Sequence, residues 1–274
     1  RGGGSSPTEQ RTVPLTGATR GGEIDALMAE VKGLAFRLTA AAISNSPSMR
    51  GRLFELRNPG NSTLTEQRES LAKRTAAVAL DELEGGIIAV ALPGPAPPPP
   101  PCFDALRLLA ELCRSKGGFD MMRRRMPTMA HGLVGDGDFP GYAPSGVAVL
   151  IDVLNHAATA CTSPCQPGDC CSNDDVAAQA WALLLEEVVS VFRLFLNHVQ
   201  RQRQIEEAEG KGPMLSLLSL IEERRDTFRA CCHTLLQHAE YPDPGRRVAS
   251  GVRQDVELLL EELLYDEEEE EEQR

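Results

Sequence analysis

Aromatic side chains are scarce in this sequence. Phe, Trp and Tyr make up 4% of its 274 residues, with one Trp and three Tyr. Sheets favour aromatic and β-branched residues, whereas the Leu, Ala, Glu and Arg that dominate here favour helices. No stretch shows the apolar–polar alternation of a strand. The composition therefore argues against a sheet protein and predicts an all-α fold.

Long apolar runs are missing as well. The nearest candidate, Ala178–Leu196, is interrupted by Glu186, Glu187 and Arg193, whereas a membrane helix needs about 20 consecutive apolar residues. The start of the chain does not have the pattern of a signal peptide. We therefore expect no membrane association.

The eight cysteines do not have the arrangement of a disulfide framework, because several fall inside helical patterns and two of these are adjacent. A reducing nuclear or cytoplasmic location is expected. Cys231-Cys232-His233 places a thiol beside a base, but Cys231 belongs to an apolar stripe, so a core cysteine beside a surface histidine is the favoured interpretation. No catalytic constellation is apparent elsewhere, so we expect neither an enzyme nor a bound cofactor.

Basic residues are few in the second half of the chain. Residues 1–140 carry 17 Lys and Arg against 15 Asp and Glu, whereas residues 141–274 carry 11 against 25. Such an acidic half is a poor surface for nucleic-acid phosphates, so no direct nucleic-acid partner is predicted. Residues 266–274 are expected to form a disordered acidic tail, because six consecutive glutamates repel one another.

The N-terminal part divides into two segments. Residues 1–21 are rich in Gly, Ser and Thr and are expected to be a disordered lead-in. Residues 22–92 contain helical patterns, the clearest over residues 23–43 and the next from Thr63 or Thr65 to Leu83. The first of these helices carries an apolar face made of Ile24, Leu27, Val31, Leu34 and Leu38.

Seven prolines occupy the nine positions 93–101. This run predicts a stiff polyproline II linker, because prolines in succession cannot continue a packed helix. An insertion between helices is the favoured role, and a ligand for a proline-reading domain is the alternative.

Residues 102–265 show further helical patterns with breakers between them. The predicted helices span about 103–115, 121–126, 145–159, 176–207, 214–239 and 248–265, and the fourth has the clearest apolar stripe. Successive helices joined by short breakers are typical of a HEAT- or armadillo-like α-solenoid. No repeat consensus is visible, so an irregular helical repeat and a compact helical bundle both remain open.

One segment suggests a metal site. Cys161, Cys165, Cys170 and Cys171 lie close together, with His156 nearby, and thiolates with an imidazole can form a tetrahedral zinc site. The usual Cys-x2-Cys spacing is absent, so an incidental surface loop is the favoured interpretation. A metal-stabilised helical module is the alternative.

Two sets of residues are candidates for partner contacts. Leu215 and Leu218 lie beside the main apolar stripe of their predicted helix and would supply an exposed apolar face. Arg123, Arg124 and Arg125 form a basic cluster that suits an acidic patch on a partner. Without interleaved aromatic residues, a solvated helix face is the favoured interpretation of this cluster.

The segment Trp181-Ala-Leu-Leu-Leu-Glu-Glu-Val-Val189, in a long helix followed by Leu-rich helices, resembles the C-terminal helical region of ATR-interacting proteins, across roughly residues 100–265. Those proteins are regulatory partners of a checkpoint kinase that senses DNA damage. The resemblance implies a non-catalytic α-solenoid docked on a larger helical-repeat protein, with this chain as a fragment of such a subunit. The sequence as a whole predicts a helical scaffold for protein–protein interaction.

Overall fold

The computed structural model describes residues 18–55, 71–88, 97–124, 144–162, 172–210, 215–240 and 250–272. Within these ranges every secondary-structure element is helical, so the predicted all-α fold is confirmed. None of the helices described here is long and apolar enough to cross a membrane. The α-helices are α1 (Ala18–Asn45), α2 (Pro47–Glu55), α3 (Leu71–Leu83), α4 (Pro100–Cys113), α5 (Lys116–Met122), α7 (Gly146–Thr162), α8 (Ser172–Ala208), α9 (Leu217–Ile221), α10 (Arg225–Glu240) and α11 (Ser250–Glu272), with a π-helical turn η2 (Glu84–Ile88) and a 3-10 turn η3 (Glu222–Arg224).

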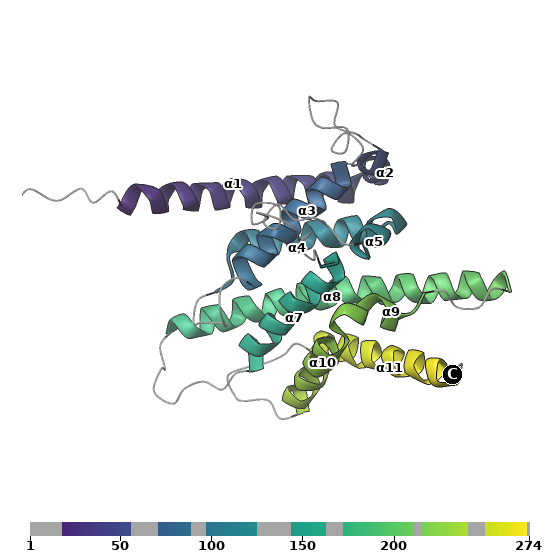
Figure 1. The fold of residues 1–274 in the computed structure, drawn as a ribbon. Coiled ribbons are helices and arrows are strands. Elements are labelled where there is room, and N and C mark those ends of the chain that lie inside the picture. Colours follow the sequence, from purple (N-terminus) through teal and green to yellow (C-terminus); the bar gives the residue numbers. More distant parts are fainter. Residues whose placement is uncertain are drawn as a thin grey trace, which may run out of the picture.

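The helices are stacked in successive layers (Figure 1). Helix α1 lies on α4, which pairs with α3, and the next layers are α7 with α8 and α10 with α11. On one side of the stack α4 packs on α8 and α8 on α11, and on the other side α3 packs on α7 and α7 on α10. Packing between neighbouring layers is how helical repeats bury their apolar faces. This arrangement favours the irregular helical repeat over a closed bundle.

Helix α8 runs through the middle of the stack and carries the clearest apolar stripe of the sequence. All the stripe residues predicted for it are buried, as a helix with neighbours on both sides requires. They are Trp181, Leu184, Leu185, Val188, Phe192, Phe195, Leu196 and Val199. The helix ends at Ala208, and Gly210 takes a φ of 68°, the left-handed conformation that glycine accepts at helix C-termini.

Several helix boundaries differ from the predicted ones. Helix α4 begins at Pro100, inside the predicted linker 93–101, because the first turn of a helix tolerates proline; residues 89–96 lie outside the described part. The single helix predicted over 214–239 is divided into α9, η3 and α10.

The acidic C-terminal segment is helical in the structure. Helix α11 continues to Glu272, so the expectation of a disordered tail over residues 266–274 is wrong for the described part of that segment. Asp266 is 2% exposed, and Glu267 forms ion pairs with Arg225 and Arg229 of α10. The expectation of a disordered tail rested on repulsion between neighbouring carboxylates. The basic side chains of α8 and α10 that pair with Asp266 and Glu267 offset part of that repulsion.

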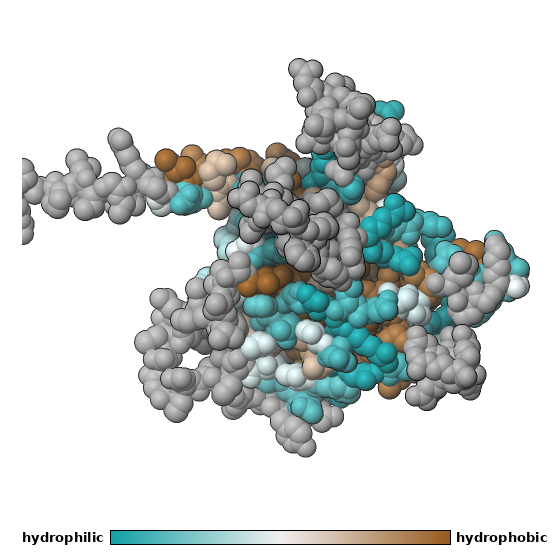
Figure 2. Space-filling view, viewed as in Figure 1, coloured by the Kyte–Doolittle hydropathy of each residue, from teal (hydrophilic) through white to brown (hydrophobic). Residues whose placement is uncertain are grey.

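Helix α1 begins at Ala18, so the predicted lead-in 1–21 is too long at its C-terminal end, while residues 1–17 lie outside the described part. Its buried residues are Gly33, Phe36 and Ile43, which face the body of the protein. Gly33 allows close approach to α4, because a Cβ there would lie 2.9 Å from the Asp104 Oδ2 atom. The predicted apolar face of this helix points the other way and is exposed (Figure 2).

Candidate protein-binding groove

A groove of about 620 Å³ lies between α5 and the C-terminal half of α8. Helix α5 lies over this half of α8 in Figure 1. Residues from α5, from α8 and from the segments after α4 and before α9 contribute to the groove. Its lining consists of Arg114, Lys116, Phe119, Asp120, Arg123, His198, Arg201, Gln202, Ile205, Glu206 and Leu215.

The floor of this groove is held by aromatic and polar contacts. Phe119 is 3% exposed, and its ring stacks on that of His198 with 4.9 Å between the centroids. The Nε2 atom of His198 lies 2.8 Å from the carbonyl oxygen of Cys113. Ser115 caps α5 by accepting a hydrogen bond from the Gly118 N–H over 3.2 Å. These contacts fix α5 against α8 and so define the groove.

Basic side chains dominate the rim of the groove. Arg114, Lys116, Arg123 and Arg201 are all exposed, although Arg114 also pairs with Glu111 on its own helix. The acidic residues of the lining are Asp120 and Glu206. This positive rim belongs to a chain whose formal net charge is −12. A local field of this sign favours an acidic ligand.

A second hollow of about 390 Å³ extends the groove toward α9. It shares Asp120 and Arg123 with the first and adds Arg124, Ser219 and Leu220. The two hollows together form a continuous basic groove, a name we keep below for the lining of both.

The predicted arginine cluster contributes to this groove. Arg123 and Arg124 are exposed where α5 ends, and the Arg123 guanidinium lies 6.0 Å from the centroid of the Phe119 ring. Arg125 lies outside the described residues. Sequence reasoning missed Arg114, Lys116 and Arg201. Arg201 lies on another helix and shares no spacing with the cluster, and Lys116 was interpreted as part of a helix stop.

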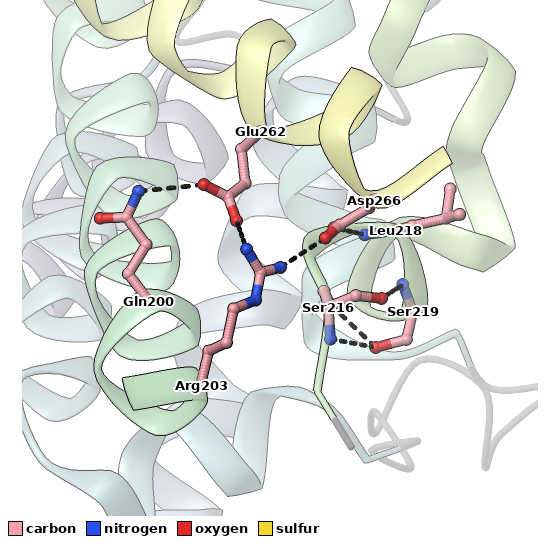
Figure 3. Close-up of polar contacts among 7 residues, drawn as sticks. All are labelled: Gln200, Arg203, Ser216, Leu218, Ser219, Glu262 and Asp266. Carbon is pink, nitrogen blue, oxygen red and sulfur yellow. Dashed lines mark hydrogen bonds and ion pairs between the residues drawn. The ribbon is translucent and has the colours of Figure 1, made fainter. Parts of the chain in front are cut away.

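The prediction that Leu215 and Leu218 offer an exposed apolar face is wrong. Leu215 is 6% exposed and Leu218 is 4% exposed, so both belong to the core. The backbone N–H of Leu218 donates to Asp266 over 3.0 Å, which holds α9 against α11 (Figure 3). Of the two leucines, Leu215 still reaches the end of the basic groove.

The same region contains a buried ionic network (Figure 3). Arg203 lies 2.8 Å from Glu262 and 2.6 Å from Asp266, and Gln200 donates to Glu262 over 3.0 Å. Burial raises the pKa of Asp266, while the Leu218 N–H and Arg203 oppose that rise and Glu262 adds to it. The network joins α8, α9 and α11, and its groups are engaged with one another, so we assign it a structural role.

The buried thiols are poor nucleophiles. Burial raises the pKa of Cys102 and of Cys113 to about 12. Burial and the neighbouring Asp152 raise the pKa of Cys231 to about 11, and its thiol lies 3.2 Å from the Asn155 Oδ1 atom. A nucleophilic thiol needs the opposite shift. The interpretation of Cys231 as a core residue is confirmed.

The proposed zinc segment is described only at its start. Cys161 is 7% exposed inside α7, and the Nδ1 atom of His156 lies 2.9 Å from the Asp152 carbonyl oxygen. Cys165, Cys170 and Cys171 lie outside the described residues. Within the ranges that the structure covers, no group of His, Cys, Asp and Glu is arranged to hold a metal ion. A zinc site at residues 161–171 stays a prediction.

Comparisons with protein-family models, with curated proteins and with solved structures found no match to this chain. The resemblance to ATR-interacting proteins stays a prediction.

Proposed function

We propose that this chain is a non-catalytic helical scaffold within a larger protein complex, and that its basic groove binds an acidic segment of a partner. The observation that carries the proposal is the convergence on one groove of Lys116 and Arg123, at the two ends of α5, with Arg201 of α8. A solvated helix face would explain the two arginines at the end of α5, but it does not explain Arg114, which follows α4, and Arg201 of α8 beside them.

The chemistry of the lining indicates what the partner segment contains. Arginine and lysine side chains pair with carboxylates, and such complementarity guides encounter and specificity. Ile205 is 44% exposed and lines the same groove as Phe119. An acidic segment with one apolar anchor residue would use both parts of the groove.

The kinase partner implied by the resemblance is a further proposal. The segment that carries the resemblance, Trp181–Val189, lies in α8. Its apolar side chains are buried, so they support the stack rather than offer a docking face: Trp181, Leu184, Leu185, Val188 and Val189. A larger helical-repeat partner, a regulatory role in a DNA-damage checkpoint and a nuclear or cytoplasmic location rest on the resemblance and the sequence alone.

Peptide display on the purified protein tests the groove. We expect selection from a library of natural peptides to enrich acidic sequences that contain an apolar residue. These should bind the wild-type chain and lose at least tenfold in affinity with Arg123→Glu or Arg201→Glu. Arg52→Glu, an exposed charge reversal on α2, is the matched control. Enrichment of basic peptides, or equal loss with the control, would contradict the proposal.

A further inference from the structure

The outer face of α1 is an uncovered apolar stripe. Figure 2 shows apolar side chains along the part of this helix that projects from the body. Large apolar side chains on one helix are normally the ones that pack against the rest of the chain. Here they are between 50% and 63% exposed: Ile24, Leu27, Met28, Val31, Leu34 and Leu38.

The spacing of this stripe is that of a coiled-coil seam. Ile24, Val31 and Leu38 repeat every seven residues, and Leu27, Leu34 and then Ala41 follow each of them by three. This is the a and d pattern of a heptad repeat, and Ile or Val at a with Leu at d is typical of two-stranded coils. The residues that α1 buries against the body occupy the opposite c and f positions: Gly33, Phe36 and Ile43. Helix α1 therefore has two apolar faces, of which one has no partner within the described residues.

The position of α1 in the stack adds a second argument. The last helix of a helical repeat normally carries a polar outer face, because no further layer follows it. Helix α1 ends the stack at the side of α4 (Figure 1), yet its outer face is apolar. We propose that this stripe packs against the same stripe of a second copy of the chain, so that two stacks join through a pair of α1 helices.

The size of the stripe is sufficient for a specific interface. Six side chains at half exposure or more on each copy would together remove on the order of 1,000 Å² of surface, about the lower limit for a specific interface. A modest interface of this kind predicts a reversible dimer rather than a permanent one.

The charges beside the seam indicate an antiparallel pair. Glu30 and Arg37 occupy the flanking g positions, whereas the e positions hold Met28 and Ala35. In an antiparallel pair with Val31 opposite Leu34 of the second copy, each Glu30 faces Arg37 across the seam. A parallel pair would place Glu30 against an alanine. Arg37 is available for this contact because its side chain is 58% exposed even though it also pairs with Asp104.

Sedimentation equilibrium of the full chain tests the proposal. We expect wild-type protein to show a reversible equilibrium between 29.7 kDa and twice that mass, and Leu27→Glu/Leu34→Glu to stay monomeric. Both leucines are at least half exposed, so circular dichroism should show unchanged melting. Leu264→Glu, at an equally exposed leucine of α11, should still dimerise.

If the wild-type chain remains monomeric at micromolar to millimolar concentration, a second copy does not cover the stripe of α1. A dimer that persists in the double variant would contradict the proposal equally. The register has its own test. Glu30→Arg should raise the dissociation constant at least tenfold by placing like charges opposite Arg37, whereas Asp25→Arg, an equal charge change outside the seam, should not. An unchanged constant for Glu30→Arg would overturn the antiparallel pairing.

Discussion

Arg203 of α8 lies 2.6 Å from Asp266 of α11, a carboxylate whose side chain is completely buried. The second oxygen of Asp266 accepts the Leu218 N–H, so one side chain connects three helices. The ring of Tyr265 lies beside the guanidinium, 4.9 Å from its centroid to the central carbon of Arg203. This arrangement explains why the acidic C-terminal segment is a packed helix up to Asp266.

Removing the Asp266 carboxylate should distinguish its hydrogen bonds from its charge. Asp266→Ala leaves the buried Leu218 N–H without an acceptor, which costs about 1–3 kcal/mol of unfolding free energy. Asp266→Asn keeps an acceptor and removes a costly buried charge, while Arg203 retains Glu262, so it should be better tolerated. Urea denaturation measures the unfolding free energy of both variants, with Glu261→Ala on the exposed side of α11 as control. Equal losses for Ala and Asn would show that the charge itself is what matters.

The raised pKa of Asp266 has a consequence for the pH dependence of stability. A carboxyl whose folded pKa exceeds its unfolded value of about 3.8 favours folding when protonated, and this contribution is lost as pH rises through the folded pKa. The melting temperature of Asp266→Asn minus that of wild type should therefore increase as pH rises above about 3.8. Calorimetry from acidic to neutral pH checks this. A difference that falls over that range would mean that Arg203 outweighs burial.

Gly118 is expected to resist substitution. A Cβ at this position would lie 2.0 Å from the Leu112 carbonyl oxygen and 2.4 Å from its carbon, both backbone atoms that cannot rotate away. Gly118→Ala should lower the unfolding free energy by about 1–3 kcal/mol. Gly51→Ala on α2, where a Cβ meets nothing within 4 Å, should instead raise it by about 0.5–1 kcal/mol. Chemical denaturation of the two variants gives both values, and a stabilising Gly118→Ala would be incompatible with this packing of α5.

The buried thiols should be protected from alkylation. Cys113 and Cys232 are fully buried, and burial raises the pKa of both, so maleimide should label them at neutral pH only after denaturation. Peptide mapping by mass spectrometry identifies the labelled sites. Ser44→Cys, on an exposed position of α1, provides a thiol that reacts in the folded protein. Rapid labelling of Cys232 without denaturant would show that α10 opens readily.

The sequence predicted helices more reliably than it predicted their partners. Helical periodicity identified the stripe of α8, which has neighbours on both sides. It also identified the buried face of α11, with Val252 and Val256, because α8 and α10 cover that face. The same periodicity in α1 marked Ile24 and Leu27, which stay exposed, because a pattern of spacing shows that a face is apolar but not what covers it. The small residue Gly33 carried too weak a signal to mark the face that meets α4.

The basic groove could not be predicted from the sequence, for a different reason. Arg201 meets Arg114 and Lys116 only through the contact of α5 with α8. This contact depends on Phe119 and His198 and leaves no common spacing along the chain. Leu215 and Leu218 were misplaced because the segment expected to be one helix is divided, so that Leu215 precedes α9 and Leu218 lies within it. Capping by Ser216 and Ser219 marks that short helix in the structure (Figure 3).

The layered stack also predicts the order in which the helices should unfold locally. Because each layer is held mainly by the layers beside it, local unfolding should proceed from the ends inward, and amide hydrogen exchange should be slowest in α8. Among the described helices α1 packs mainly on α4, with a smaller contact to α2, so its amides should exchange early at low protein concentration. At higher concentration a second copy would supply the missing layer, and protection of α1 would then report directly on how many molecules are paired.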